Sequence, residues 1–314
     1  MNRLFDFMLP PEKSTTAGEV DALFHFITEV SLILLLGITA VMLYFAFKYR
    51  RKSEDETTPL ITHNNTLEIT WSVIPLILVL IVFSWGYQGY LAKTNPPDDA
   101  YEIRAVATSW LWQFHYQNGH VSTNELHVPA NRPVRIIMSS DDVIHSFYVP
   151  DYRVKMDVLP NRYTQVWFEA TEPGESVLYC AEYCGTAHSD MLADVIVHTQ
   201  EDFELWLETG DAIDEDLSPA ELGEQLVQRQ GCMACHSTDG TVLQGPSFLG
   251  AFGRDRELTD GTTVTIDENY IRQSLLEPNT QVAAGFQPIM PSYAASLNDR
   301  QIDAIIEYLK TLEE

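Results

Sequence analysis

The sequence predicts a multidomain α+β membrane protein with a two-helix transmembrane hairpin, a small β-sandwich and an all-α C-terminal domain. Two long apolar runs stand near the start of the chain, short β-rich runs follow, and amphipathic helical patterns close the sequence. At 314 residues the chain is too long for one average domain. We expect the hairpin and N-terminal segment at 1–95, the sandwich at 96–208, a linker at 209–218 and the last domain at 219–314.

The composition is strongly acidic, with a formal net charge of −26 at pH 7. This charge argues against nucleic-acid binding and indicates solubility or a cationic partner. The four cysteines fall in two close pairs, Cys180 with Cys184 and Cys232 with Cys235. Two disulfides are one interpretation. Each pair, however, lies inside a denser cluster of metal-ligand residue types, which favours metal chemistry.

Two apolar runs, at 27–47 and 69–91, are long enough to cross a membrane. Glu29 alone breaks the first run, and the second carries no charge. At ~1.5 Å per residue, each run can cross a hydrocarbon layer ~30 Å thick. Trp71 and Trp85, near opposite ends of the second run, are typical of interfacial anchors. These features favour membrane spans over buried helices of a soluble core.

The loop between the two runs indicates the orientation. Four basic residues follow the first run closely: Lys48, Arg50, Arg51 and Lys52. The positive-inside rule makes this loop cytoplasmic and places both termini on the outer face. We therefore expect a bacterial inner-membrane protein, in contact with lipid, whose two other domains lie on the periplasmic face.

Beyond Pro97 the local patterns change twice. Short β-rich runs separated by turn residues predict a sandwich or barrel; they lie at 101–108, 133–138, 163–170, 176–180 and 193–199. After an acidic stretch, Ser218 is a helix N-cap followed by proline at the first helical position. Asn298, with Gln301 three residues on, predicts the start of an amphipathic C-terminal helix.

A cluster of soft ligands at 180–191 indicates copper. Two thiolates, the His188 imidazole and the Met191 thioether lie within twelve residues, and His145 lies upstream. A mononuclear blue-copper site needs one cysteine, two histidines and an axial methionine. The additional thiolate here predicts that both sulfurs bridge two copper ions. Each ion then takes one histidine, and Met191 and the Glu182 carbonyl are the weak axial ligands.

Three other interpretations of this cluster stay open from the residues alone. Cys180 and Cys184 could form a disulfide. A Cys2His2 zinc site is chemically possible, although it leaves Met191 without a role. His145, considered by itself, could be a core histidine. The neighbouring histidine and methionine would be coincidental in the first case.

The second cysteine pair belongs to the haem-attachment signature C-x-x-C-H. Cys232 and Cys235 would form thioethers with the haem, and His236 would bind its iron. A redox C-x-x-C motif is the alternative, but the βαβ pattern of thioredoxin is missing from this region. His236 is the only histidine after residue 200, and Met233 is enclosed by the motif. Met290 is therefore the candidate sixth ligand, giving a His/Met iron of raised potential.

These motifs carry a resemblance to a known family. The pattern C-x-E-x-C-G-x-x-H-x-x-M from Cys180 and the D-V-x-H-S-F motif around His145 resemble cytochrome oxidase subunit II over residues of about 18–208. That family has a two-helix hairpin followed by a cupredoxin domain with a dinuclear copper centre. Residues 219–313 resemble a class I cytochrome c, and Gly245-Pro246 resembles the turn that packs on its proximal histidine. The fusion is similar to caa-type oxidases.

The resemblance implies further functional residues. Trp110 and Trp112 match the family's aromatic patch for electron uptake, with Trp110 outermost. The Glu182 side chain would face a magnesium ion shared with the catalytic subunit. Glu68 matches the carboxylate at the mouth of a proton pathway on the cytoplasmic side. Leu111 departs from the family pattern, because an aromatic residue is common there, and this weakens the idea of an extended aromatic face.

The expected function follows from this resemblance. Electrons would pass from the haem to the dinuclear copper and on to catalytic subunit I, which reduces oxygen to water with proton translocation. The oxygen site is not expected on this chain. Expected partners are the other oxidase subunits and either a donor with a basic face or a quinol-oxidising complex. The alternatives are a subunit of a copper-containing nitric-oxide reductase, a membrane-tethered electron carrier and a copper chaperone, which would need no haem.

Overall fold

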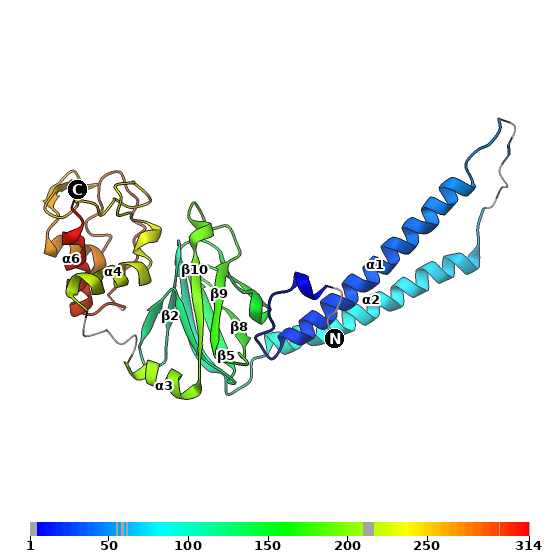
Figure 1. Cartoon of the computed structure of the whole chain (residues 1–314), viewed down its shortest axis with the longest axis horizontal. Helices are drawn as coiled ribbons and strands as arrows, with labels where there is room; N and C mark the ends of the chain where they lie inside the picture. The colour runs from blue at the N-terminus through cyan, green and yellow to red at the C-terminus, as the bar shows by residue number, and fades with distance from the viewer. Residues whose placement is uncertain are drawn as a thin grey trace. The chain divides into compact units, whose positions relative to one another are not determined.

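The computed structural model describes residues 5–54, 56–57, 60, 62–209, 217–294 and 296–313. The chain divides into two compact units, Met1–Asn95 and Pro96–Glu314, and each is described by itself. Most of the predicted linker at 209–218 lies outside the described residues. The second unit contains the β-sandwich and the helical C-terminal region (Figure 1).

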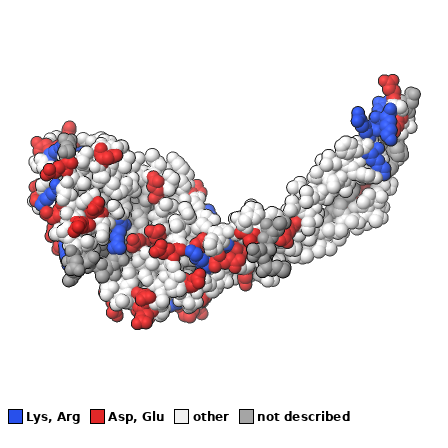
Figure 2. Space-filling model, in the orientation of Figure 1, with Lys and Arg blue, Asp and Glu red and all other residues white. Residues whose placement is uncertain are grey.

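The first unit is a hairpin of two long helices, α1 (Ala17–Lys48) and α2 (Asn65–Thr94), after a 3-10 turn at Asp6–Met8. Both helices are long and apolar enough to cross a membrane, and their apolar windows bury nothing within the protein. Soluble proteins rarely expose so large a continuous apolar surface. Basic side chains gather at the loop end of the hairpin (Figure 2), which carries the residues from Lys48 to Lys52.

The β-sandwich has two five-stranded sheets in the described part of the chain, ordered β3-β2-β1-β5-β8 and β4-β10-β9-β6-β7. The strands are β1 (Tyr101–Thr108), β2 (Leu111–His115), β3 (Val121–Thr123), β4 (Glu125–Pro129), β5 (Val134–Ser140), β6 (His145–Val149), β7 (Val154–Val158), β8 (Thr164–Phe168), β9 (Gly174–Cys180) and β10 (Leu192–His198). Strand β1 alternates buried and partly exposed residues, as expected of a strand with one face on the core. The fully buried rings of Trp112, Phe114, Phe147 and Phe168 fill the core.

Two pairings place the functional residues. Strands β1 and β5 pair in parallel, with Ala107 opposite Ser140. Because both strands run in the same direction, the turns that follow them lie at the same end of the sheet. Strands β6 and β9 pair antiparallel in the other sheet, with Phe147 opposite Cys180. The segment 141–144 carries the chain from the first sheet to the second.

Helix α3 (Gln200–Thr209) follows β10 directly and was not predicted. The Thr199 hydroxyl accepts a hydrogen bond from the Asp202 amide at 3.1 Å, which caps the first turn. Phe203 and Trp206 are buried against the sandwich. Trp206 stacks on the His127 ring with centroids 4.0 Å apart. The helix therefore extends the core of the sandwich.

The C-terminal region contains α4 (Pro219–Arg229), α5 (Glu268–Leu276) and α6 (Asp299–Thr311). Both predicted N-caps are confirmed, because Ser218 and Asn298 each form a capping box with the residue three positions on. A short antiparallel ribbon, β11 (Asp255–Glu257) with β12 (Thr263–Thr265), corrects the expectation of a wholly α-helical region. Its turn contains Asp260-Gly261, a dipeptide typical of hairpins, with Gly261 at φ +83°.

Candidate functional site

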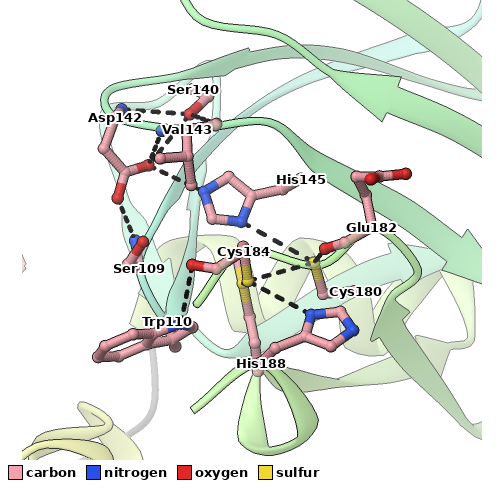
Figure 3. Close-up of polar contacts among 11 residues, drawn as sticks. Ser109, Trp110, Ser140, Asp142, Val143, His145, Cys180, Glu182, Cys184 and His188 are labelled. Carbon is pink, nitrogen blue, oxygen red and sulfur yellow. Dashed lines mark hydrogen bonds and ion pairs between the residues drawn. The ribbon is translucent and has the colours of Figure 1, made fainter. Parts of the chain in front are cut away.

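The first cluster lies on the loop between β9 and β10. Cys180 ends β9, and Met191 immediately precedes β10. Cys184 and His188 come from the loop itself. His145 opens β6, which the β6–β9 pairing places beside Cys180. One tight loop and one neighbouring strand thus bring together all the predicted copper ligands, of which Figure 3 labels His145, Cys180, Glu182, Cys184 and His188.

Each thiol in this cluster has its own histidine. The two sulfurs are 3.8 Å apart. Cys180 Sγ lies 3.8 Å from His145 Nδ1, and Cys184 Sγ lies 3.4 Å from His188 Nδ1. A disulfide has an S–S length of ~2.05 Å, so the pair is two free thiols, in agreement with the metal interpretation.

Two further donors stand at the ends of the cluster. Met191 Sδ is 3.7 Å from Cys184 Sγ, and the Glu182 carbonyl accepts from Cys180 Sγ at 3.3 Å. Metal bonds of ~2.0–2.3 Å at tetrahedral angles put ligand atoms ~3.3–3.8 Å apart. The observed separations fit that range. Because His145 and Met191 are fully buried, a metal held here would be shielded from water.

The two thiols differ in acidity. Burial raises the pKa of Cys180, but hydrogen bonds from His145 and from backbone amides outweigh it and lower the pKa to about 7. Burial and the adjacent negative charge of Cys180 raise the pKa of Cys184 to about 12. One sulfur is therefore readily ionised, and the second gives up its proton only to a cation.

Both predicted uptake tryptophans lie against the cluster. Trp110 Nε1 donates to the Cys184 carbonyl at 3.2 Å (Figure 3). A Cβ at Gly185 would lie 3.0 Å from the Trp110 ring, so the indole packs directly on this backbone. Trp112 is fully buried and meets the His145 ring edge-on, with centroids 6.3 Å apart. Trp110 is the outer and Trp112 the inner residue of the pair.

The imidazole of His145 is held from its other side by Asp142, the first residue of the D-V-x-H-S-F motif, for which no role was predicted. His145 Nε2 lies 2.9 Å from Asp142 Oδ1. Burial would raise the pKa of Asp142, but hydrogen bonds from His145, Ser109 and Val143 hold it well below its ordinary value. The carboxylate is therefore ionised, and it fixes Nδ1 of His145 as the nitrogen that faces the sulfurs.

The second cluster lines a cavity of about 160 Å³ in the C-terminal region. Cys232, Cys235, His236 and Met290 all line it. Cys232 and Cys235 are both free thiols. Met233 is 36% exposed, whereas Met290 packs against the core of this region. The structure thus places the predicted haem ligands around one apolar hollow and turns Met233 outward.

The ring of His236 is oriented by its neighbours. Its Nδ1 donates to the Pro246 carbonyl at 2.7 Å, which leaves Nε2 free to bind a metal. Phe248 stacks on the ring with centroids 4.4 Å apart. A Cβ at Gly245 would lie 2.6 Å from His236 Cε1, so only glycine fits beside the ring. The predicted contact of the Gly245-Pro246 turn with this histidine is confirmed.

The two remaining predicted residues lie apart from the donor atoms. The carboxylate of Glu182 is exposed and points away from the sulfurs, although its carbonyl points toward them (Figure 3). Glu68 lies in the first turn of α2, where its Oε1 accepts from the Asn64 amide at 3.2 Å. Asn64 in turn accepts from the Leu67 amide. Glu68 therefore has a local capping role, whatever its part in proton transfer.

Comparison with known proteins identifies the family. The periplasmic domain of cytochrome c oxidase subunit II matches residues 85–199, its transmembrane domain matches 3–86, and cytochrome c matches 220–313. A cytochrome c oxidase subunit 2 from Alkalihalophilus pseudofirmus is 32% identical, over 92% of this chain and 86% of that protein. The chain belongs to the cytochrome c oxidase subunit II family.

The sequence of a second subunit II protein agrees with this assignment. That of Bacillus subtilis is 27% identical, over 95% of this chain and 90% of its own length. The periplasmic domain of a Bradyrhizobium japonicum subunit II is 29% identical, covering 37% of this chain and 96% of that structure, with a TM-score of 0.35. The present subunit II is thus a membrane-anchored part of a haem–copper oxidase, an oxidoreductase, with a copper-binding cupredoxin-like domain and a haem-binding cytochrome c domain.

Proposed function

We propose that this subunit II is the electron-uptake subunit of a respiratory oxidase. It passes electrons from a covalent haem c to a dinuclear copper centre and on to the catalytic subunit, which reduces oxygen to water and translocates protons. One observation carries the proposal: two thiols 3.8 Å apart each face a separate histidine. A mononuclear site would leave one thiolate without a function.

In this proposal the chain supplies a rigid frame for two copper ions. Cys180 and Cys184 would supply the shared sulfur ligands, His145 and His188 would each hold one ion, and Met191 and the Glu182 carbonyl would be the weaker donors. The bound pair supplies a one-electron carrier whose charge is shared by both ions. The fully buried side chains and the β6–β9 pairing resist rearrangement of the ligands. Little ligand movement is needed when the charge of the site changes.

The residues that line the C-terminal cavity support a covalently attached haem. Cys232 and Cys235 would hold it through two thioethers, and His236 and Met290 would bind its iron. The haem when bound supplies a one-electron iron centre. The Pro246 carbonyl and the Gly245 contact hold the His236 ring in orientation. The thioether of Met290 favours ferrous iron and so raises the potential.

Electrons would leave the haem domain by way of Trp110, whose indole is bonded to the Cys184 carbonyl. The donor is a protein with a basic face. The haem domain at 219–314 has 14 acidic and 6 basic residues, a net −8, and eight more acidic residues with no basic one lie in the preceding segment 200–218. Charge of this density steers a cationic partner toward the haem domain and is screened by salt.

The proposal also includes the orientation of the chain in the membrane and roles for the carboxylates of Glu182 and Glu68. The basic loop end of the hairpin lies in the cytoplasm, so both cofactor domains face the periplasm. The outward carboxylate of Glu182 supplies one ligand to a magnesium ion shared with the catalytic subunit. Glu68 begins the proton pathway on the cytoplasmic side. The exposure of both carboxylates supports a role toward a partner subunit.

The experiment uses the full chain purified with its oxidase partners. We expect two copper ions and one covalent haem per chain, a mixed-valence electron spin resonance signal, and oxygen consumption with a reduced donor. Cys184→Ser should abolish the signal and keep the haem. Cys235→Ser, the reciprocal control, should weaken haem attachment and keep the copper signal. An unchanged mixed-valence signal in Cys184→Ser would refute the dinuclear site.

A further inference from the structure

The turn that carries Trp110 and the strand that carries His145 come from different sheets, yet one carboxylate joins them. Asp142 lies in the segment that crosses from β5 to β6. Its Oδ1 accepts from His145 Nε2 at 2.9 Å, and its Oδ2 accepts from the Ser109 amide at 2.8 Å (Figure 3). Ser109 directly precedes Trp110 in the turn between β1 and β2.

The position of this carboxylate is well determined by its own segment. The Val143 amide donates to Oδ1 at 2.7 Å. The Ser140 hydroxyl lies 3.2 Å from the same oxygen, but it donates its one proton to the Val143 carbonyl at 2.5 Å. With Ser109 and His145, three donors therefore converge on one carboxylate. A side chain held by three donors can transmit a fixed position from one partner to another.

The opposite side of Trp110 is also fixed. Its indole Nε1 donates to the carbonyl of Cys184, and its ring packs on Gly185, whose φ of +121° favours glycine. The backbone before Trp110 is therefore tied to one proposed copper ligand, and its ring is tied to another. Trp110 is thus linked to His145 through Ser109 and Asp142, and to Cys184 through its own indole.

We propose that Asp142 is a positioning residue, which holds the uptake residue Trp110 and the copper ligand His145 in one hydrogen-bonded unit. This inference rests on the proposed function for the copper site and for Trp110. Asp142 orients the imidazole through Nε2–H and increases its basicity toward a metal at Nδ1. It also keeps the Trp110 turn at a constant distance from the copper ligands.

Asp142→Asn tests the geometry, because an amide has one acceptor oxygen and one donor nitrogen. Its NH2 group must face either the Ser109 amide or His145 Nε2–H, and both of these are donors. Asp141→Asn is the matched control. It removes the same charge from the adjacent, exposed position, so steering of a cationic donor changes in both variants.

Three measurements on the full chain in its assembled oxidase separate the variants. Hydrogen–deuterium exchange of the Ser109 amide should accelerate about tenfold or more in Asp142→Asn, in the copper-loaded and the copper-depleted chain alike. The copper potential should rise more than in Asp141→Asn, because a less basic imidazole stabilises the oxidised site less. Copper reduction after photoreduction of the haem by a ruthenium tris-bipyridyl complex should slow several-fold.

The proposal is overturned if Asp142→Asn matches Asp141→Asn in all three measurements. It is also overturned if exchange at Ser109 accelerates while the potential and the rate follow the control, because the carboxylate then holds only the turn. Should Asp142→Asn fail to fold, Asp142→Glu keeps the charge but displaces the carboxylate, and the same results are expected of it. If the wild-type oxidase had no mixed-valence signal, the proposed function would be refuted instead. The exchange comparison at Ser109 would still test the hydrogen bond to Asp142, because it needs no copper.

Discussion

Gly245→Ala is expected to disturb the haem domain through a single contact. The added Cβ would lie 2.6 Å from His236 Cε1, and ordinary contact requires ~3.4 Å, so the ring must retreat by about 0.8 Å. A retreat of that size takes the 2.7 Å bond from His236 Nδ1 to the Pro246 carbonyl past its limit of ~3.2 Å. Overpacking costs about 1–3 kcal/mol and the lost hydrogen bond about 1 kcal/mol. The reduced freedom of the unfolded chain offsets less than about 1 kcal/mol.

The net loss of about 1–3 kcal/mol should lower the midpoint of thermal unfolding of the haem domain by roughly 5–15 °C, followed by haem absorption in the full chain. The reduction potential of the haem should also change, because the His236 ring is the proposed iron ligand. Gly253→Ala is the control: its φ of +80° strains alanine, but nothing lies within 4 Å of the new Cβ. It should lower stability and leave the potential unchanged. A Gly245→Ala chain with wild-type melting and potential would refute the reasoning.

Three other changes have defined outcomes. Met290→Ala should keep the covalent haem and lower its reduction potential in a potentiometric titration; an unaltered potential would assign the sixth position to another group. Gly223→Ala should destabilise the haem domain by about 2–4 kcal/mol in a thermal melt, because the added Cβ would lie 2.0 Å from the Ala304 carbonyl where α4 crosses α6. The control Glu224→Ala, on the exposed face of α4, should change the stability little. The affinity of the metal-free chain for copper should rise about tenfold per pH unit above neutrality, because the raised pKa of Cys184 keeps this thiol protonated and copper must displace the proton. Chelator competition at several pH values measures the affinity, and an affinity independent of pH would contradict the prediction.

The sequence predicted elements with a clear period and missed those without one. Strand β1 alternates along its whole length, and its predicted range, 101–108, agrees with the structure. Strands β4 and β6 are buried on nearly every residue, so no alternation marks them. In α3 only Phe203 and Trp206 are buried, too few to reveal a helical period in ten residues. The Asp260-Gly261 dipeptide was the available signal for the β11–β12 ribbon.

The site residues that lie close together in the sequence were predicted, and the role of Asp142, whose partners the fold brings together, was missed. Cys180, Cys184, His188 and Met191 lie on one loop, so their spacing was visible in the sequence. Asp142 is the first residue of the D-V-x-H-S-F motif, which distinguishes it from Asp141, but the motif does not show which groups the carboxylate binds. Its role depends on the parallel pairing of β1 with β5, which brings two distant turns together. Pairing of this kind is a property of the fold.

The uneven distribution of the proposed copper ligands along the sequence also affects the order of folding. Contacts within the loop 180–191 join residues that are close in the sequence. His145 is thirty-five residues away from Cys180 and reaches it only when β6 pairs with β9. Contacts of long sequence separation form late, because the entropy of loop closure must first be overcome. A chain with unpaired sheets offers an incomplete set of ligands and holds copper weakly. We therefore expect stable retention of copper only in chains whose two sheets have paired.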